Sequence, residues 1–207
     1  MNRIFVTGID TGIGKTLVSA ILVEALHADY WKPIQSGNLN DSDTMTVRRL
    51  ITNSTSVFHQ EAYRLTQPLS PHAAAEIDNI KIDLDKICSL VPAVKERHLI
   101  VEGAGGAMSP VNDALVVLDL IQRLEAEAVI VSKHYLGSIN HTLLTISALR
   151  RRGIPIRGLV FNGKPEKSTE DFILRYSNLK VLLSIDEEKS LDKKTVNKYA
   201  GAFKEAF

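Results

Sequence analysis

The chain lacks the features that mark secreted, membrane and nucleic-acid-binding proteins. Its single cysteine, Cys88, cannot form an internal disulfide, which indicates a reducing compartment. No apolar run approaches the length of a membrane span, and the N-terminal run meets Asp10 and Lys15 too soon for a secretory signal. A net charge of +1 gives no basic field that would attract nucleic acid. These absences favour a soluble cytoplasmic protein that binds neither membranes nor nucleic acid.

The sequence contains instead an alternation of short apolar runs and helical patterns. Its 207 residues fit one domain, residues 1–207, large enough to bury a core. Strands are expected at 4–7, 30–34, 99–101, 128–131, 159–161 and 181–185. Helices are expected at 15–28, 43–51, 84–96, 114–124, 139–152, 169–176 and 193–207. This alternation predicts an α/β fold in three layers: a mostly parallel sheet with helices on both faces.

Ligands of such sheets bind at the carboxyl ends of the strands. The segments expected there are 7–15, 33–37, 102–106, 132–140 and Asn162. Residues 53–82 have the least regular pattern, and a connection of that length in a compact domain is more often a functional loop than a plain linker.

The stretch FVTGIDTGIGKT, residues 5–16, is typical of a phosphate-binding P-loop. Its glycines lie between an apolar strand and an amphipathic helix, so that backbone N–H groups and the helix N-terminus can surround an anion. Lys15 would reach the β- and γ-phosphates, and Thr16 would ligate Mg²⁺. Five residues separate Gly8 from Gly14, one more than the usual motif has. The spare residue leaves Asp10 and Thr11 at the tip, where they could face a second substrate. The alternative is a strand–helix turn with incidental glycines.

Two carboxylates are candidates for holding a metal beside this loop. Glu102 ends a buried strand and is followed by glycines that allow a ligand close to the backbone. Asp43 is the second candidate, although Asp41, Ser42 and Asp43 also form a natural cap for the following helix.

A set of motifs in one order resembles the dethiobiotin synthetase family. The motifs are VTGIDTGIGKT, YWKPIQSG, NDSDT, PLSPHAA, VEGAGG and LGSINHTLLT, and they span nearly the whole chain. The lengthened P-loop is the family's own form. The resemblance implies a P-loop NTPase-type fold and a step of biotin biosynthesis. In that step, 7,8-diaminononanoate, CO₂ and ATP give dethiobiotin, ADP and phosphate through a carbamate and a carbamic–phosphoric anhydride.

The resemblance also implies roles for individual residues. The implied catalytic residues are Thr11, Lys15 and Lys32. The implied ATP-binding residues are Gly12, Ile13, Gly14, Lys15, Thr16, Leu17, Asp43, Glu102, Gly103, Ala104, Gly105 and Asn162. The implied substrate-binding residues are Thr11, Lys32, Ser36, Gly105, Leu136, Gly137 and Asn140, and the implied ligands of Mg²⁺ are Thr16, Asp43 and Glu102. A homodimer is implied as well, in which residues 136–141 of the second subunit receive the substrate carboxylate.

Some of these roles have plainer alternatives in the sequence. Lys32 is typical of a solvated lysine at a strand edge, and Asn140 and His141 are typical of helix capping and packing. Asn162 matches the family's adenine-contacting Asn, but Ile185 and Asp186 stand where the family usually has a Pro near the base. Relaxed nucleotide specificity is therefore a hypothesis.

The alternative function is a P-loop switch ATPase that binds a membrane or a protein partner. Its support is the C-terminal pattern, which places Val196, Tyr199, Phe203 and Phe207 on one helical face that could lie on a membrane surface. The other interpretation is a closing helix packed on the core, because Gly201 interrupts the pattern and acidic residues are interleaved.

Overall fold

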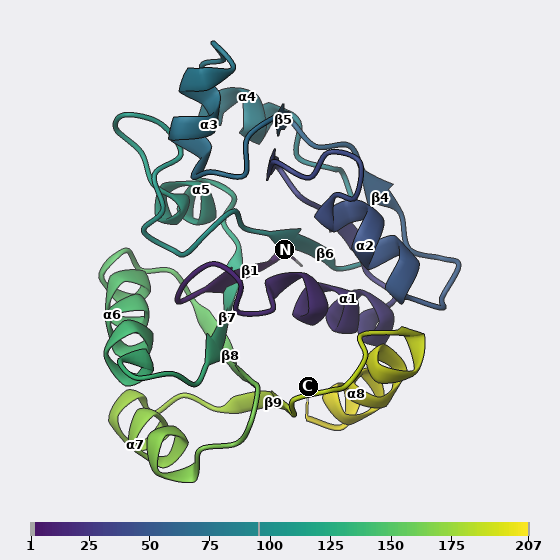
Figure 1. The fold of residues 1–207 in the computed structure, drawn as a ribbon, viewed down its shortest axis with the longest axis vertical. Coiled ribbons are helices and arrows are strands. Elements are labelled where there is room, and N and C mark those ends of the chain that lie inside the picture. The colour runs from purple at the N-terminus through teal and green to yellow at the C-terminus, as the bar shows by residue number, and fades with distance from the viewer. Residues whose placement is uncertain (1–2, 95, 207) are drawn as a thin grey trace.

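The computed structural model, which describes residues 3–94 and 96–206, contains a central seven-stranded sheet (Figure 1). Its strand order is β4-β2-β6-β1-β7-β8-β9, and each of these pairings is parallel. The strands are β1 Arg3–Gly8, β2 Asp29–Trp31, β4 Phe58–His59, β6 Leu99–Glu102, β7 Glu127–Lys133, β8 Ile156–Asn162 and β9 Val181–Ile185. Apolar runs without alternation form these strands because both faces of the sheet are covered.

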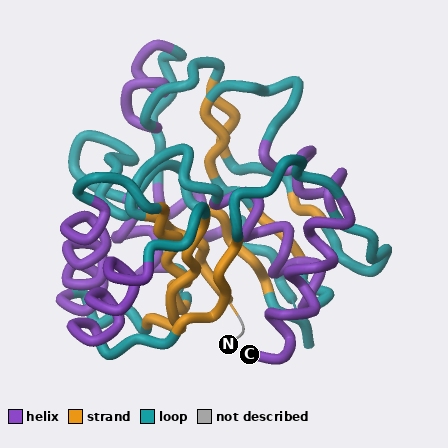
Figure 2. Tube along the Cα trace, turned by 60° about the horizontal axis from the view of Figure 1, so that its bottom comes forward, coloured by secondary structure: helices purple, strands orange, loops and turns teal. Residues whose placement is uncertain are grey.

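Helices cover both faces of the sheet, as Figures 1 and 2 show from two directions. On one side lie α1 Lys15–Leu26, α2 Asp43–Leu50 and α8 Lys193–Ala206, and on the other lie α5 Val117–Arg123, α6 Ser138–Arg151 and α7 Lys167–Ser177. Two short helices, α3 Pro71–Ile77 and α4 Leu84–Ser89, lie at one end of the molecule. The predicted three-layer α/β architecture is therefore confirmed.

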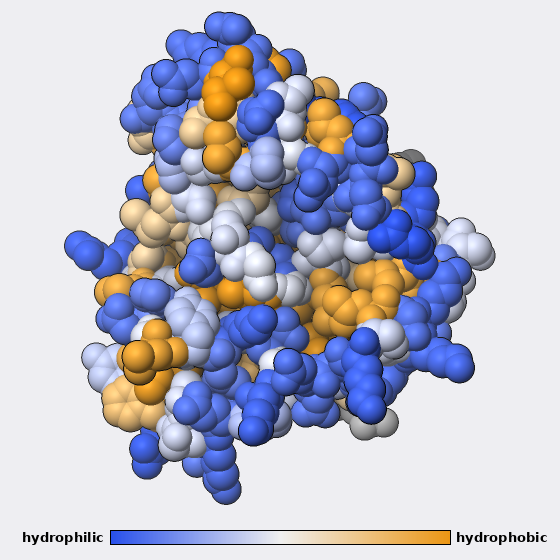
Figure 3. Space-filling model, viewed as in Figure 1, coloured by the Kyte–Doolittle hydropathy of each residue, from blue (hydrophilic) through white to orange (hydrophobic). Residues whose placement is uncertain are grey.

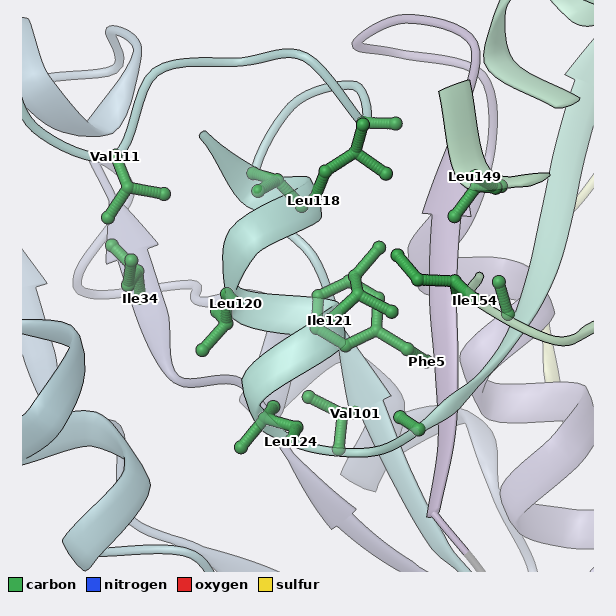
Figure 4. Packing of buried hydrophobic residues seen from close by; sticks show 14 of the residues in the cluster. Phe5, Ile34, Val101, Val111, Leu118, Leu120, Ile121, Leu124, Leu149 and Ile154 are labelled. Carbon is green, nitrogen blue, oxygen red and sulfur yellow. The ribbon is translucent and has the colours of Figure 1, made fainter. Parts of the chain in front are cut away.

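Each face of the sheet has its own hydrophobic core. Because side chains alternate along a strand, Phe5 of β1 packs in the cluster under α5, whereas Ile4 and Val6 pack in the cluster under α1. Figure 4 shows Phe5 beneath Ile121 of α5. Burying a side chain of this size contributes about 1.5–3 kcal/mol. The two cores fix the sheet edge at which the P-loop lies.

The predicted single strand at residues 30–34 is wrong. Pro33 has no N–H for a strand ladder and a fixed φ, so the chain breaks after β2. The following strand, β3 Ile34–Ser36, leaves the main sheet and pairs with β5 Tyr63–Leu65 in a separate two-stranded sheet. Lys32 consequently lies at the junction of the two sheets.

The stretch 53–82 is more regular than expected. It contains β4, β5 and α3, which are too short to produce a clear periodicity. The helix expected at 84–96 is shorter in the structure, where α4 ends at Ser89, three residues before Pro92. A proline disfavours the helical conformation in the residue that precedes it, which limits how far the helix can extend.

The C-terminal helix packs on the core. Val196, Tyr199 and Phe203 of α8 are buried in the same cluster as α1. The closing-helix interpretation is therefore confirmed, and the apolar face that suggested a membrane surface is used for packing; Phe207 lies outside the described residues. Within the described ranges, no helix combines the length and apolarity that crossing a membrane requires.

Apolar side chains reach the surface in separate groups, as the face in Figure 3 illustrates. Ile77 and Leu90 belong to the α3–α4 end of the molecule. Leu136, which is completely exposed, lies just before α6, and Leu144 lies in the middle of that helix. This region thus presents apolar side chains close to the functional site described below.

Candidate functional site

The P-loop connects β1 to α1 at the carboxyl edge of the sheet. Gly12 and Gly14 have φ values of 65° and 98°, conformations that side-chain-bearing residues rarely adopt. A Cβ atom on Gly14 would also lie 2.2 Å from the amide nitrogen of Asn162. No side chain caps the N-terminus of α1, so its first N–H groups are left for an anion. This geometry is that of a phosphate-binding loop rather than of an incidental turn.

Lys15 lies folded back across the loop. Its ammonium group donates a hydrogen bond of 2.8 Å to the carbonyl of Asp10, which the lengthened loop places within reach. Burial lowers the pKa of Lys15 to about 8, and the nearby carboxylate of Glu102 offsets only part of this effect. The amine is therefore held at the position from which it can contact phosphates.

The proposed metal-side groups converge on the start of α1. The hydroxyl of Thr16 lies 3.0 Å from Oδ1 of Asp43 and 2.9 Å from Oε1 of Glu102. Ser42, not Asp43, caps α2, because the Ser42 side chain accepts a hydrogen bond from the N–H of Met45. The Asp43 carboxylate is therefore free to face the P-loop, and the capping interpretation does not explain it.

Lys32 is an interior residue and not a solvated lysine at a strand edge. Its side chain is 5% exposed, and its Nζ lies 3.0 Å from Oε1 of Glu102 and in an ion pair with Asp43. Burial alone would lower the pKa of Lys32, but the two carboxylates outweigh it and raise the pKa. The ammonium group of Lys32, held by two carboxylates, thus lies beside the P-loop.

Two residues that support this cluster were missed in the sequence. The hydroxyl of fully buried Tyr30 donates to Oε2 of Glu102 at 2.9 Å. The side chain of Gln35 accepts from the N–H of Asp43 at 3.2 Å and donates to the carbonyl of Gly37 at 3.0 Å. Tyr30 lies within an apolar strand pattern, whereas Gln35 lies in the segment 33–37 expected at the carboxyl edge of the sheet, which was the available signal for it.

The oxygens of Thr16, Asp43 and Glu102 suit Mg²⁺. A hydroxyl and two carboxylates are hard oxygen ligands, which this ion prefers. The Thr16 hydroxyl already lies within hydrogen-bond distance of both carboxylates. Among the described residues no cluster of three or more His, Cys, Asp or Glu side chains forms an alternative metal site.

Two cavities meet at the P-loop. The first extends over the ends of β7, β8 and β9, and its lining includes Lys133, His134, Tyr135, Leu136, Gly137, Asn140, Asn162, Asp186, Glu187 and Glu188. The second contains the charged cluster, and its lining includes Thr11, Lys15, Thr16, Lys32, Ser36, Asp43, Glu102, Gly103, Ala104 and Gly105. Gly12, Gly14, Leu17 and Leu191 line both. A ligand with two ends can therefore occupy both cavities across the loop.

Comparison with known proteins identifies the family to which the chain belongs. The family described as AAA domain matches residues 2–195. The ATP-dependent dethiobiotin synthetase BioD of Cytophaga hutchinsonii is 48% identical over 200 residues, covering 97% of this chain and 96% of the relative. The enzyme of that name from Christiangramia forsetii is 49% identical, with 97% and 95% covered. The one from Chlamydia pneumoniae is 44% identical, with 100% and 91% covered.

The chain belongs to the dethiobiotin synthetase family. The resemblance seen in the sequence motifs is thereby confirmed, and with it an ATP-dependent ligase. Solved structures of similar shape include the cell division ATPase MinD of Pyrococcus furiosus, with a TM-score of 0.63, 17% identity and 99% of both chains covered. A ParA family ATPase from Chlorobium tepidum has a TM-score of 0.58 and 15% identity, with 100% of this chain and 93% of that one covered. Such low identities establish a P-loop NTPase-like fold alone.

The structure brings some of the family's implied substrate residues together and leaves others apart. Thr11, Lys32, Ser36 and Gly105 line the second cavity, and the buried hydroxyl of Ser36 has no hydrogen-bond partner within the described chain. Leu136, Gly137 and Asn140 line the first cavity instead. Within one chain of this dethiobiotin synthetase family member, the two groups therefore do not form a single substrate site.

Asn162 has a structural contact in addition to its proposed contact with the base. Its side-chain amide donates to the carbonyl of Ile13 at 2.8 Å and thereby supports the P-loop. Like Asn162, Asp186 lines the first cavity, on the loop that follows β9. The base-binding role of Asn162 thus stays a prediction.

Proposed function

We propose that this chain carboxylates 7,8-diaminononanoate and closes its ring to dethiobiotin at the expense of ATP, a step of biotin biosynthesis. The observation that carries the proposal is the buried convergence of Lys15 and Lys32 on the carboxylates of Asp43 and Glu102 at one end of a P-loop. The family's printed activity requires ATP, and this cluster offers the fixed positive charge that a triphosphate and a second anion need in order to meet.

The chemistry proceeds in three steps, one addition and two displacements. One amine of the diamine adds CO₂ and becomes an anionic carbamate. A carbamate oxygen attacks the γ-phosphorus of ATP, ADP leaves, and the carbamic–phosphoric anhydride remains. The second amine then attacks the carbamoyl carbon and phosphate leaves, which closes the cyclic urea. Lys15 and Lys32 reduce the repulsion between carbamate and triphosphate, and the Thr11 hydroxyl at the loop tip lies beside the reacting groups.

Thr16, Asp43 and Glu102 are the residues that would hold Mg²⁺. When bound, the ion supplies positive charge to the phosphates. Tyr30 keeps one oxygen of Glu102 occupied and leaves Oε1 facing Thr16 and Lys32. These residues thus orient the carboxylate before any ligand binds.

A second copy of the chain would complete the substrate site. Gly137 precedes the first residue of α6, and no side chain caps this helix; the N–H of Ser138 donates to the carbonyl of Tyr135, so the next N–H groups of the first turn would receive the carboxylate of the substrate. Leu136 and Leu144 are exposed beside it, as expected of an apolar interface. We call residues 136–141 the carboxylate cradle. We propose a homodimer in which each subunit contributes its carboxylate cradle to the second cavity of the other subunit. We expect this dimer in the cytoplasm.

Phosphate release tests the proposed reaction. The chain is incubated with ATP, Mg²⁺, bicarbonate and 7,8-diaminononanoate, and each component is omitted in turn. We expect release only in the complete mixture, with dethiobiotin formed in equal amount. Release that is independent of the diamine and stimulated by liposomes would contradict the proposal and favour the switch ATPase.

Nucleotide choice is tested separately. Because Ile185 and Asp186 replace the family's usual Pro at the base, we propose that the site tolerates nucleotides other than ATP. Turnover is compared with ATP, GTP and CTP at equal concentrations. A steep loss with GTP and CTP would disprove the relaxed specificity without affecting the proposed reaction.

A further inference from the structure

The loop between β9 and α8, residues 186–192, contains neither helix nor strand and forms part of the wall of the first cavity. Asp186, Glu187 and Glu188 line the first cavity, and Leu191 lines both. Opposite them lie Gly12 and Leu17 of the P-loop region. A flat ligand in this cavity needs the loop held at a fixed position.

The hydroxyl group of Tyr199 supports the first part of this loop, whereas Thr195 of α8 holds its last part through hydrogen bonds to the Ser190 carbonyl at 3.0 Å and the Asp192 carboxylate at 2.9 Å. The Tyr199 hydroxyl accepts a hydrogen bond of 3.0 Å from the N–H of Asp186 and donates one of 2.6 Å to Oε1 of Glu188. The ammonium group of Lys198 lies 2.7 Å from the same Glu188 oxygen. Both ends of the segment 186–188 are therefore attached to one side-chain oxygen on α8.

The ring of Tyr199 connects this contact to the core. Tyr199 is 4% exposed and packs in the cluster that also contains Leu17, Ile185 and Phe203. Burial, together with the hydrogen bond to Glu188, raises the pKa of the Tyr199 hydroxyl, which therefore remains protonated and able to donate at neutral pH. The loop position is thus determined by the packing of α8.

The nucleoside part of ATP belongs in the cavity that this loop borders. Lys32, Asp43, Glu102 and Ser36 occupy the second cavity, so the γ-phosphate must point there. The other end of the nucleotide then leaves the P-loop on the opposite side, where the first cavity begins. Leu17 and Leu191 offer apolar side chains to the faces of a base.

We propose that Tyr199 is a positioning residue for nucleotide binding, which acts by holding residues 186–188 of this loop against the nucleoside. The inference rests on the proposed use of ATP by this site. Tyr199 itself touches neither phosphate nor substrate; it acts through Asp186 and Glu188. Its loss should therefore weaken nucleotide binding and leave the chemistry at Lys32 intact.

The test is Tyr199→Phe, which removes the hydroxyl and keeps the ring. We expect the Kd for ADP, measured by calorimetry, and the KM for ATP to rise about three- to tenfold, the range expected for one lost net hydrogen bond. The kcat at saturating ATP and the KM for 7,8-diaminononanoate should stay within about twofold.

The matched control is Tyr63→Phe. Tyr63 is also buried, and its hydroxyl accepts a 3.0 Å hydrogen bond from the N–H of Asp83, but it lines neither cavity. This variant should lose comparable thermal stability without any change in ADP affinity. Equal effects of the two substitutions on the Kd for ADP, or a parallel rise in the KM for the diamine, would overturn the proposal.

A second variant, Glu188→Ala, avoids the core. It should weaken ADP binding. The double variant with Tyr199→Phe should bind ADP no more weakly than the weaker of the two single variants, because both substitutions remove the hydrogen bond between Tyr199 and Glu188. Additive losses would mean that Glu188 contacts the nucleotide directly and would overturn the proposal. If the wild type binds ADP but releases no phosphate with the diamine, the proposed reaction fails, while the ADP measurements still decide the role of Tyr199.

Discussion

At the scale of single residues, the two buried lysines differ in what surrounds them. Lys15 crosses the P-loop toward a carbonyl group, whereas Lys32 lies between two carboxylates. Burial lowers the pKa of Lys15 to about 8, while in Lys32 the carboxylates outweigh burial and raise the pKa. The two positions predict separate roles: Lys15 in nucleotide binding and Lys32 in turnover.

Substitution should separate these roles. Lys15→Ala is expected to raise the Kd for ADP at least about tenfold, because the phosphates lose a charged donor. Lys32→Ala is expected to change this Kd by less than about threefold and to lower kcat by about 100-fold or more, as with other losses of charge stabilisation in a transition state. Calorimetry and steady-state kinetics measure both, with the exposed Lys180→Ala as the control. A Lys32→Ala enzyme with full kcat would refute the role of Lys32.

The pKa of Lys15 predicts proton uptake on nucleotide binding. Above pH 8 most Lys15 side chains of the ligand-free protein are neutral, whereas phosphates favour the charged form. Binding of ADP at pH 9 should therefore take up close to one proton at this residue, and affinity should fall as pH rises above 8. Calorimetry in buffers of different ionisation enthalpy measures the uptake. Lys15→Met should abolish the proton uptake that accompanies ADP binding at pH 9. If the uptake is unchanged in that variant, the proton binds to a residue other than Lys15.

At the scale of elements, one buried carboxylate joins α1 to the segment after α2. Glu24 accepts hydrogen bonds from the backbone and the side chain of both Thr52 and Asn53, at 2.6–3.1 Å. Burial alone would raise the pKa of Glu24, but these hydrogen bonds outweigh it and lower the pKa. The charged carboxylate therefore stabilises the contact between the two helical segments.

Glu24→Gln should reveal this contribution through its pH dependence. Because the pKa of Glu24 is lower in the folded than in the unfolded state, its stabilisation is present above about pH 4.5 and is lost as pH falls through the folded pKa. At pH 7 the substitution should cost about 1–3 kcal/mol of unfolding free energy. Urea denaturation at pH 7 and at lower pH should show the difference from wild type shrinking with acid. A constant difference would contradict the assigned charge effect.

Elements with strong patterns were predictable from the sequence, and contacts between them were not. Strands β6 to β9 follow apolar runs that burial on both faces requires, whereas β3 and β5 are too short for any period to appear. Pro33 was visible, but the transfer of the chain to a second sheet depends on a partner at Tyr63–Leu65. In the site, the spacing of the P-loop motif predicted the position of Lys15. The hydrogen bond between Tyr30 and Glu102 was not predictable, because it joins residues 72 positions apart in the sequence.

At the scale of the whole molecule, the arrangement predicts that one chain is not sufficient. The cradle at Gly137 and Asn140 lines the first cavity, away from the second cavity that contains Lys32. A two-fold dimer would bring the cradle of one copy to the cluster of the other. Catalysis would then require residues from both copies in each site.

Mixing inactive variants tests this requirement. Lys32→Ala and a cradle variant, Asn140→Ala combined with Leu136→Ala, should each have low activity with the diamine. After random exchange of subunits, half of the dimers are mixed and each has one intact site, so about a quarter of wild-type activity should return. Sedimentation verifies the dimers, and a mixture of Lys32→Ala with itself is the control. No recovery despite exchange would place each complete site within one chain.

The P-loop lies between the two cavities, so that the proposed nucleoside site and the proposed diamine site are on different sides of it. The first cavity extends over the ends of β8 and β9 and the second contains the charged cluster, and the two share Gly12, Gly14, Leu17 and Leu191 in their linings. We therefore expect that neither reactant has to bind before the other and that spent nucleotide can leave while the organic product is still bound. The order in which the reactants bind would then follow from the position of the P-loop between the two cavities.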